Sequence, residues 1–232
     1  VSTSMLAEDL KPNRLEGAKD VAAEFINGRP NDNIGITLFA GETFTQCPLT
    51  VDHAVLLDMI HNIKCGLITD GTAVGMGIAN AVTRLKDSKA KSKVIILLTD
   101  GTNNKGDISP MTAAEIAKSF GIRVYTIGVG TNGMAPYPYP VGNTVQYVSM
   151  PVEIDEKTLT EIAGTTDGNY FRATSNSKLK EVYEEIDKLE KTKLNVKEYS
   201  KRDEEYHWFA LAAFLCVLLE VLLRNSVLKK IP

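Results

Sequence analysis

The stretch that most constrains the fold is Lys93–Asn104, which reads Lys-Val-Ile-Ile-Leu-Leu-Thr-Asp-Gly-Thr-Asn-Asn. Its first half is an unbroken apolar run rich in β-branched residues, typical of a strand buried on both faces in a parallel sheet. The run stops at Thr99-Asp100-Gly101, so a carboxylate follows the C-terminal end of a central strand. Ligands bind at that edge of open α/β sheets, although a lone Asp in this place more often caps the next turn.

Apolar residues recur along the rest of the chain with alternating strand and helix periods, from which we expect the following elements. They are a helix from Pro12–Leu15 to Asn27, strands at Asn33–Phe39 and Thr43–Cys47, helices at His53–Ile63 and Ala73–Leu85, a strand at Lys93–Thr99, a helix at Pro110–Phe120, a strand at Arg123–Ile127, a helix at Asp155–Ala163, a strand at Asn169–Arg172 and a helix at Asn176–Leu189. This alternation predicts a doubly wound, mostly parallel α/β sheet with helices on both faces.

One segment matches the sequence pattern of a dinucleotide-binding motif but lacks the structural context that the motif needs. Gly128–Gly133 fits Gly-x-Gly-x-x-Gly, but the motif requires a following helix to receive the pyrophosphate. Pro136, Pro138 and Pro140 prevent such a helix, so we expect an irregular or hairpin insertion over 136–150 instead.

Composition excludes some classes of partner and leaves others open. The net charge of −3 gives no reason to expect nucleic acid. Cys47, Cys65 and Cys216 lack Cys-x-x-Cys spacing; the first two can pair only if the fold brings them together, and free thiols are the simpler expectation.

The composition of the chain changes after residue 190. We expect a charged linker at 191–206, a transmembrane helix at 207–224 that is near the lower length limit for a span, and a basic tail at 225–232. A buried core helix is the alternative for the apolar run. Arg224, Lys229 and Lys230 outnumber Lys201 and Arg202, which slightly favours a cytoplasmic C-terminus.

Oxygen donors fall at the loops of the expected sheet edge. Ser2 and Ser4 lie near the start of the chain, Thr72 precedes a helix, and Asp100 follows the central strand; Asp70 is near enough to act as an outer acceptor. Taken singly, the serines fit a frayed terminus, and Thr72 fits a helix cap. Together they form a hard-oxygen set that suits Mg²⁺, Mn²⁺ or Ca²⁺ rather than Zn²⁺.

Ser2-x-Ser4, Thr72 and Thr99-Asp100-Gly101 resemble the metal-ion-dependent adhesion site (MIDAS) of von Willebrand factor type A (VWA) domains. The family pattern is Asp-x-Ser-x-Ser, then Thr, then Asp, and its first Asp would precede Val1. A closer resemblance, to the BatA group of the Bat aerotolerance membrane proteins, is carried by Phe39–Glu42, Gln46–Thr50 and Leu98–Asn104.

This resemblance implies a VWA domain over 1–190 that lacks its first strand, with Ser2, Ser4, Thr72 and Asp100 around one cation. It further implies a bacterial inner-membrane protein with a periplasmic domain, whose metal accepts a carboxylate from a protein partner. Other Bat proteins and a MoxR-type AAA+ ATPase system are the implied associates. A VWA scaffold without metal and an α/β-fold enzyme are the alternatives; the sequence shows no Gly-x-Ser-x-Gly elbow and no phosphate loop, so no enzymatic activity is expected.

The expected order of strands has a consequence for this chain. In the family's sheet the first strand lies between those at Asn33–Phe39 and Lys93–Thr99 and delivers the first Asp. A chain that starts at Val1 is therefore expected to be a fragment that is weakly folded and binds Mg²⁺ poorly.

Overall fold

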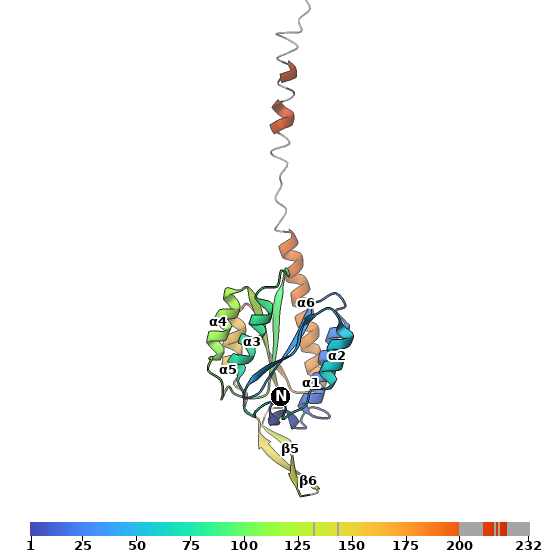
Figure 1. Ribbon diagram of the computed structural model, residues 1–232, viewed down its shortest axis with the longest axis vertical. Helices are drawn as coiled ribbons and strands as arrows, with labels where there is room; N and C mark the ends of the chain where they lie inside the picture. Colours follow the sequence, from blue (N-terminus) through green and yellow to red (C-terminus); the bar gives the residue numbers. More distant parts are fainter. Residues whose placement is uncertain (132, 143, 200–210, 216, 218, 222–232) are drawn as a thin grey trace, which may run out of the picture. The chain divides into compact units, whose positions relative to one another are not determined.

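The computed structural model describes residues 1–131, 133–142, 144–199, 211–215, 217 and 219–221. The chain divides into two compact units, Val1–Glu190 and Lys191–Pro232. The first unit holds every strand of the described chain and is the part that positions the candidate site (Figure 1).

The elements of the first unit alternate much as the periodicity predicts. A short 3₁₀ helix, η1 (Thr3–Leu6), is followed by α1 (Arg14–Asn27), β1 (Ile34–Phe39), β2 (Thr43–Thr50), α2 (His53–His61), α3 (Val74–Leu85), β3 (Lys93–Thr99), α4 (Pro110–Ser119), β4 (Ile122–Val129), β5 (Met134–Val141), β6 (Thr144–Pro151), α5 (Glu156–Thr165), β7 (Tyr170–Ala173) and α6 (Asn176–Tyr199). Local chemistry sets several helix starts. Asn13, Asp52, Ser109 and Asp155 each accept a hydrogen bond from a backbone N–H in the first turn.

The strands in the described part of the chain form three separate sheets. β4 is central in a parallel sheet of order β3-β4-β7, in which Lys93 is opposite Ile122 and Thr99 is opposite Gly128. β1 pairs antiparallel with β2, and β5 with β6. Among the described residues β1 and β3 share no strand ladder.

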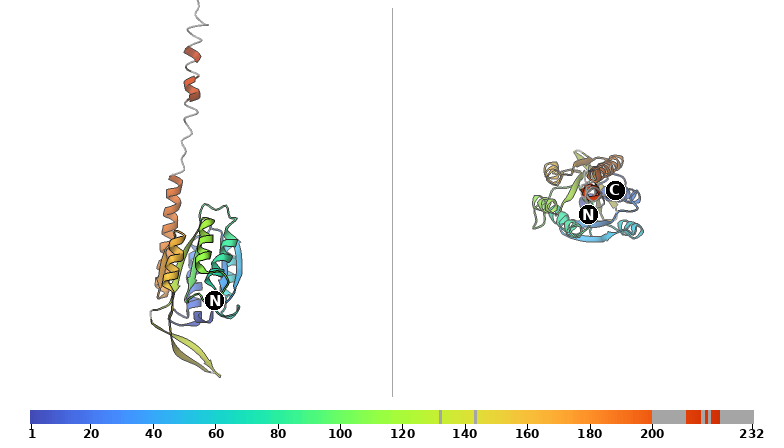
Figure 2. Two further views of the ribbon diagram at one scale, coloured as in Figure 1. Left: turned by 90° about the vertical axis from the view of Figure 1, so that its left-hand side faces the viewer. Right: turned by 90° about the horizontal axis from the view of Figure 1, so that it is seen from above.

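Two hydrophobic cores lie on the two faces of the parallel sheet. α1, α2 and α6 cover one face, and α3, α4 and α5 cover the other (Figures 1 and 2). Side chains along β4 alternate between them: Ile122 and Val124 enter the second core, whereas Tyr125 and Ile127 enter the first. The predicted α/β fold, with a parallel sheet and helices on both faces, is confirmed.

The small residues of α3 allow close packing. A Cβ atom on Gly77 would lie 3.0 Å from the ring of Phe39 in β1, and one on Gly75 would lie 2.0 Å from the carbonyl oxygen of Ile108. The helix therefore approaches both β1 and the loop before α4 more closely than larger side chains permit.

The C-terminal region departs from the expected boundaries. α6 continues to Tyr199, through the first part of the expected linker, because Lys191–Tyr199 contains neither Gly nor Pro. Most of the expected span at 207–224 lies outside the described residues, and the described ones include no helix with the length and apolarity to cross a membrane. The expected transmembrane helix is therefore unsupported by the structure.

Candidate functional site

Two of the predicted donor segments meet where β3 ends. The Ser4 hydroxyl, in η1, donates a hydrogen bond to Oδ1 of Asp100 at 3.0 Å. The hydroxyl oxygens of Ser2 and Ser4 are 2.7 Å apart, so both serines turn toward the same carboxylate. Residues almost a hundred positions apart in the chain thus form one polar cluster.

Thr72 completes the cluster from a third loop. A cavity of about 30 Å³ is lined by the N-terminal residue Val1, by Gly71 and apolar side chains, and by four polar residues, Ser2, Thr72, Thr99 and Asp100. All four polar residues are buried, with Asp100 only 5% exposed. The structure therefore brings all four predicted site residues together, three on the cavity and Ser4 bonded to two of them.

Two asparagines, whose role the sequence did not reveal, hold the Thr72 loop against the loop after β3. The Thr72 N–H donates to Oδ1 of Asn104 at 2.9 Å, and the Val74 N–H donates to Oδ1 of Asn103 at 2.8 Å. The Asn104 N–H in turn donates to the Thr72 carbonyl at 3.0 Å. The Asn103-Asn104 pair next to Thr99-Asp100-Gly101 was the available signal, because amide side chains satisfy loop backbone groups.

A buried ion-pair chain lies on the other side of Asp100. Arg14 donates to Oδ2 of Asp100 at 2.8 Å and forms two bonds of 2.7 Å to the carboxylate of Asp9. All three side chains are at least 96% buried. Sequence analysis placed Arg14 only at a helix start, since spacing along one chain does not show which carboxylate a long side chain reaches.

Asp9 also fixes the loop after β4. The N–H of Thr131 donates to Oδ2 of Asp9 at 2.8 Å. Burial alone would raise the pKa of Asp9, but the bonds from Arg14 and Thr131 outweigh burial and hold that pKa below its usual value. Asp9, Arg14 and Asp100 thus connect three loops at this edge of the sheet.

Asp70 occupies a supporting position. Its two carboxylate oxygens accept hydrogen bonds from the N–H and the hydroxyl of Thr3, at 3.0 and 2.8 Å, and these bonds lower its pKa. Asp70 therefore holds the segment between Ser2 and Ser4; its contribution to a metal site stays a prediction.

The donor set has the chemistry of a site for a hard cation. The cavity volume is close to the space of one water molecule, and three hydroxyl oxygens and one carboxylate surround or adjoin it. Within the described part of the chain no group of three or more His, Cys, Asp or Glu side chains could hold a metal. Any site here depends on hydroxyl groups, which fit Mg²⁺, Mn²⁺ or Ca²⁺ better than Zn²⁺.

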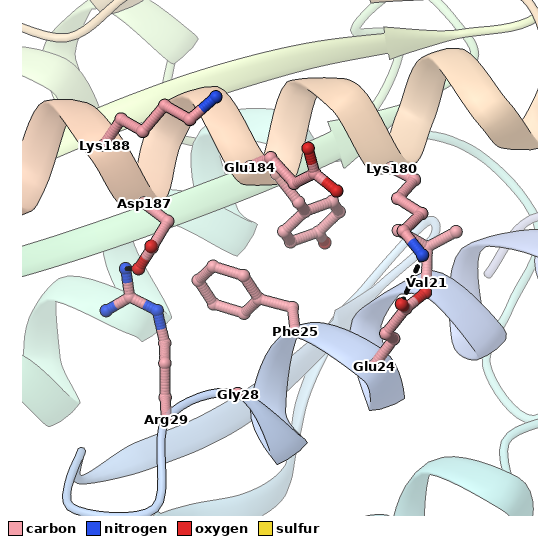
Figure 3. A pocket seen from close by; sticks show the side chains of 10 residues that line it. Val21, Glu24, Phe25, Gly28, Arg29, Lys180, Glu184, Asp187 and Lys188 are labelled. Carbon is pink, nitrogen blue, oxygen red and sulfur yellow. Dashed lines mark hydrogen bonds and ion pairs between the residues drawn. The ribbon is translucent and has the colours of Figure 1, made fainter.

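A larger groove of about 300 Å³ lies elsewhere, between α1 and α6 (Figure 3). Phe25 and Tyr183 form its floor with ring centroids 4.9 Å apart, and the Arg29 guanidinium lies 4.5 Å from the centre of the Phe25 ring. Arg29 pairs with Asp187, and Lys180 pairs with Glu24. These ion pairs join α1 and the turn after it to α6 across the groove, which indicates a role in packing rather than ligand binding.

The glycine motif and the two described cysteines agree with the sequence predictions. The glycines of Gly128–Gly133 lead into β5 rather than a helix, so rejecting the dinucleotide motif was correct. Cys47 and Cys65 are free thiols, and Cys216 lies outside the described residues.

Comparison with known proteins identifies the family. Residues 1–185 match the von Willebrand factor type A domain. A Borreliella burgdorferi protein described as uncharacterized is 28% identical over the whole chain, which covers 68% of that protein. A UPF0353 protein of Nocardia farcinica is 32% identical over 81% of this chain, which covers 60% of that protein. The chain thus spans about two thirds or less of these relatives.

Solved structures agree with this assignment. The conserved hypothetical protein BatB from Bacteroides thetaiotaomicron superposes with a TM-score of 0.72 at 35% identity, over 82% of this chain and 95% of that one. An aerotolerance-related membrane protein from Bacteroides fragilis gives a TM-score of 0.70 at 32% identity, over 81% and 92% of the two chains. The predicted kinship with Bat proteins is confirmed, while the assignment to the BatA group is only approximate. The chain belongs to the von Willebrand factor type A domain family, and its structural neighbours include Bat aerotolerance-related proteins.

Proposed function

We propose that this domain is a non-enzymatic binding module that takes a protein partner through a divalent cation. The observation that carries the proposal is the convergence of Ser2, Ser4, Thr72 and Asp100 around one cavity of about 30 Å³. Three loops from separate parts of the chain deliver these oxygens to the carboxyl edge of β3, where open α/β sheets bind ligands.

Each residue has a defined part in the proposed site. The hydroxyls of Ser2 and Ser4, with either Thr72 or Asp100, would contact the cation directly, and the remaining residue would contact it through water. A bound Mg²⁺, Mn²⁺ or Ca²⁺ supplies an incompletely neutralised positive charge that can accept a carboxylate from the partner. Arg14 holds Asp100 on the side away from the serines, because it bonds Oδ2 while Ser4 bonds Oδ1.

We further propose that the domain is periplasmic and anchored in the bacterial inner membrane by residues 207–224. The described residues of that apolar run are exposed, including Leu211 at 54% and Phe214 at 62%. The names of the Bacteroides neighbours support a membrane protein related to aerotolerance. Other Bat proteins and a MoxR-type AAA+ ATPase system are the proposed associates.

One observation favours a second candidate, a VWA scaffold that works without metal. Asp100 is the one carboxylate among the four proposed ligands, and Arg14 already pairs with it. A cation there would add a positive charge beside a guanidinium, which weakens binding. A VWA neighbour from mussel byssus is described with a zinc-occupied MIDAS motif, but at 24% identity it supports the fold alone.

Calorimetric titration of the full chain with Mg²⁺ and Mn²⁺ separates these candidates. We expect Thr72→Val to abolish binding and Thr112→Val, an exposed threonine in α4, to leave it unchanged. One Asp added directly before Val1 should tighten binding on the order of tenfold or more, because one further charge contact is worth about 1–4 kcal/mol. Failure of the wild-type and the Asp-extended chain to bind either ion, with the fold intact, would favour the scaffold.

A further inference from the structure

The hairpin of β5 and β6 is a highly exposed part of the first unit. It projects from the body of the domain (Figures 1 and 2), and all eight residues of β6 are exposed. No residue from Met134 to Met150 carries a charge. A two-stranded hairpin is marginally stable alone in water, so an exposed uncharged one has the character of an interaction surface.

Prolines reveal which way the backbone groups of β5 point. Pro136, Pro138 and Pro140 are opposite Ser149, Tyr147 and Val145 respectively. Since proline has no N–H, these can only be the pairs that do not bond across the hairpin, and their backbone groups face outward. The carbonyl of Pro136 indeed accepts a bond from the N–H of Glu8 in the body of the domain, at 2.9 Å. The outer edge of β5 is therefore without N–H donors at three alternate positions.

The same register leaves the outer edge of β6 open. Val145, Tyr147 and Ser149 direct both N–H and C=O away from β5, because they belong to the same non-bonded pairs. Within the described chain none of their N–H groups donates to backbone outside the hairpin. Natural proteins blunt exposed edges with proline, charge or bulges, and here only β5 is blunted. β6 thus offers a ready edge for strand addition.

We propose that β6 pairs antiparallel with β6 of a second copy of this chain, which forms a four-stranded sheet of order β5-β6-β6-β5. A two-fold axis through Tyr147 places Tyr147 opposite itself and Val145 opposite Ser149 of the second copy, so that outward N–H and C=O groups meet. No side chain of either strand carries a charge, so two identical β6 edges meet without like charges on the paired strands. The Tyr147 hydroxyl donates to the carboxylate of Glu8 in the body of the domain at 3.0 Å. This dimer does not depend on the metal-binding proposal.

The first test is disulfide trapping in the full chain. Tyr147→Cys places a thiol on the proposed two-fold axis, where facing Cα atoms come within disulfide range. Tyr139→Cys is the control matched in exposure: Tyr139 is 58% exposed, against 59% for Tyr147, but lies on β5. Tyr147→Phe, which removes the hydroxyl bond to Glu8 without adding a thiol, controls for the loss of that bond. In the proposed sheet the β5 strands are about 14 Å apart, beyond disulfide reach. We expect a disulfide-linked dimer for Tyr147→Cys alone, above the background of unmodified chain; equal trapping of both variants, or of neither, would overturn the proposal.

The second test examines the register itself by sedimentation velocity over a range of concentrations. Val145→Lys combined with Ser149→Glu puts opposite charges face to face across the axis, whereas Val145→Lys combined with Ser149→Lys puts like charges there. The two-lysine variant should dimerise more weakly than the mixed one, on the order of tenfold. Equal hydrogen-exchange protection of the inward Val148 amide in the two variants would show that the hairpin is intact. A wild-type chain that stays monomeric, or two variants that associate equally, would contradict the inference.

Discussion

Asp100 is held by two neighbours of opposite character. Ser4 donates to one carboxylate oxygen from the cavity side, and Arg14 donates to the other from within the protein. A carboxylate with both oxygens engaged in defined directions is fixed in orientation. Asp100 thus bonds to Arg14 within the fold through Oδ2, while the same side chain lines the cavity.

Arg14→Met should lower the free energy of unfolding by about 3–5 kcal/mol, because it leaves the carboxylates of Asp9 and Asp100 buried without their cation. Urea denaturation measures the change. Lys178→Met, which breaks an exposed ion pair with Glu181, should leave the midpoint unchanged. If the urea midpoint shifted equally in both variants, the buried ion pairs would contribute no more to stability than the exposed pair.

A further buried carboxylate, that of Glu190, predicts how stability responds to acid. Glu190 is 5% exposed and accepts bonds from Tyr125, Ser92 and Arg123. Burial alone would raise its pKa, but these bonds outweigh burial and lower it. Ionised Glu190 therefore contributes its full stabilisation when the pH is above the unfolded-state pKa of about 4.3. This stabilisation is lost as the pH falls through the folded-state pKa, which is lower.

We therefore expect melting temperatures of wild-type chain to fall more steeply than those of Glu190→Gln between about pH 5 and pH 3. The variant should be less stable than wild type at neutral pH and approach it in acid. If melting temperature fell with pH in parallel for the two proteins, the pKa of Glu190 would be the same in the folded and unfolded states.

At the scale of elements, the sequence predicts what depends on local periodicity. The apolar run of β3 and the helices α3 and α6 all appear where expected, because each is encoded within a few adjacent residues. The bonds of Arg14 to Asp9 and Asp100 were not predictable, since they depend on how separate loops meet. The four site residues were found through a family motif, whereas their shared cavity required the fold.

Two glycines of different surroundings test the packing of the helices. Gly75→Ala should destabilise the domain by about 1–3 kcal/mol or more, because the new Cβ would lie 2.0 Å from the Ile108 carbonyl oxygen. Gly164→Ala in α5 meets no atom within 4 Å and should stabilise by roughly 0.5–1 kcal/mol. Thermal unfolding of both variants gives the signs; a neutral Gly75→Ala would mean that α3 can move away from the loop before α4.

At the scale of the whole molecule, protection from solvent is uneven. β4 lies between β3 and β7 and contributes to both hydrophobic cores. The β5–β6 hairpin has one strand that is exposed throughout. Stability within a domain follows such differences in burial, so its parts should open separately.

Native-state hydrogen exchange in dilute solution should therefore find the slowest amides in β4 and faster ones in the hairpin. Within β6, the outward amides of Val145, Tyr147 and Ser149 should exchange faster than the inward amide of Val148. Equal rates for neighbouring β6 amides would contradict the register on which the outward edge is based.

The three prolines of β5 also limit how far assembly by strand addition can proceed. A copy that has paired through β6 presents only the β5 edges of its sheet, and these lack donors at Pro136, Pro138 and Pro140. Growth therefore terminates at two copies, where a hairpin with both edges open could polymerise into a filament. Replacing these prolines would remove the stop, so the row of prolines sets the stoichiometry as well as the shape of the hairpin.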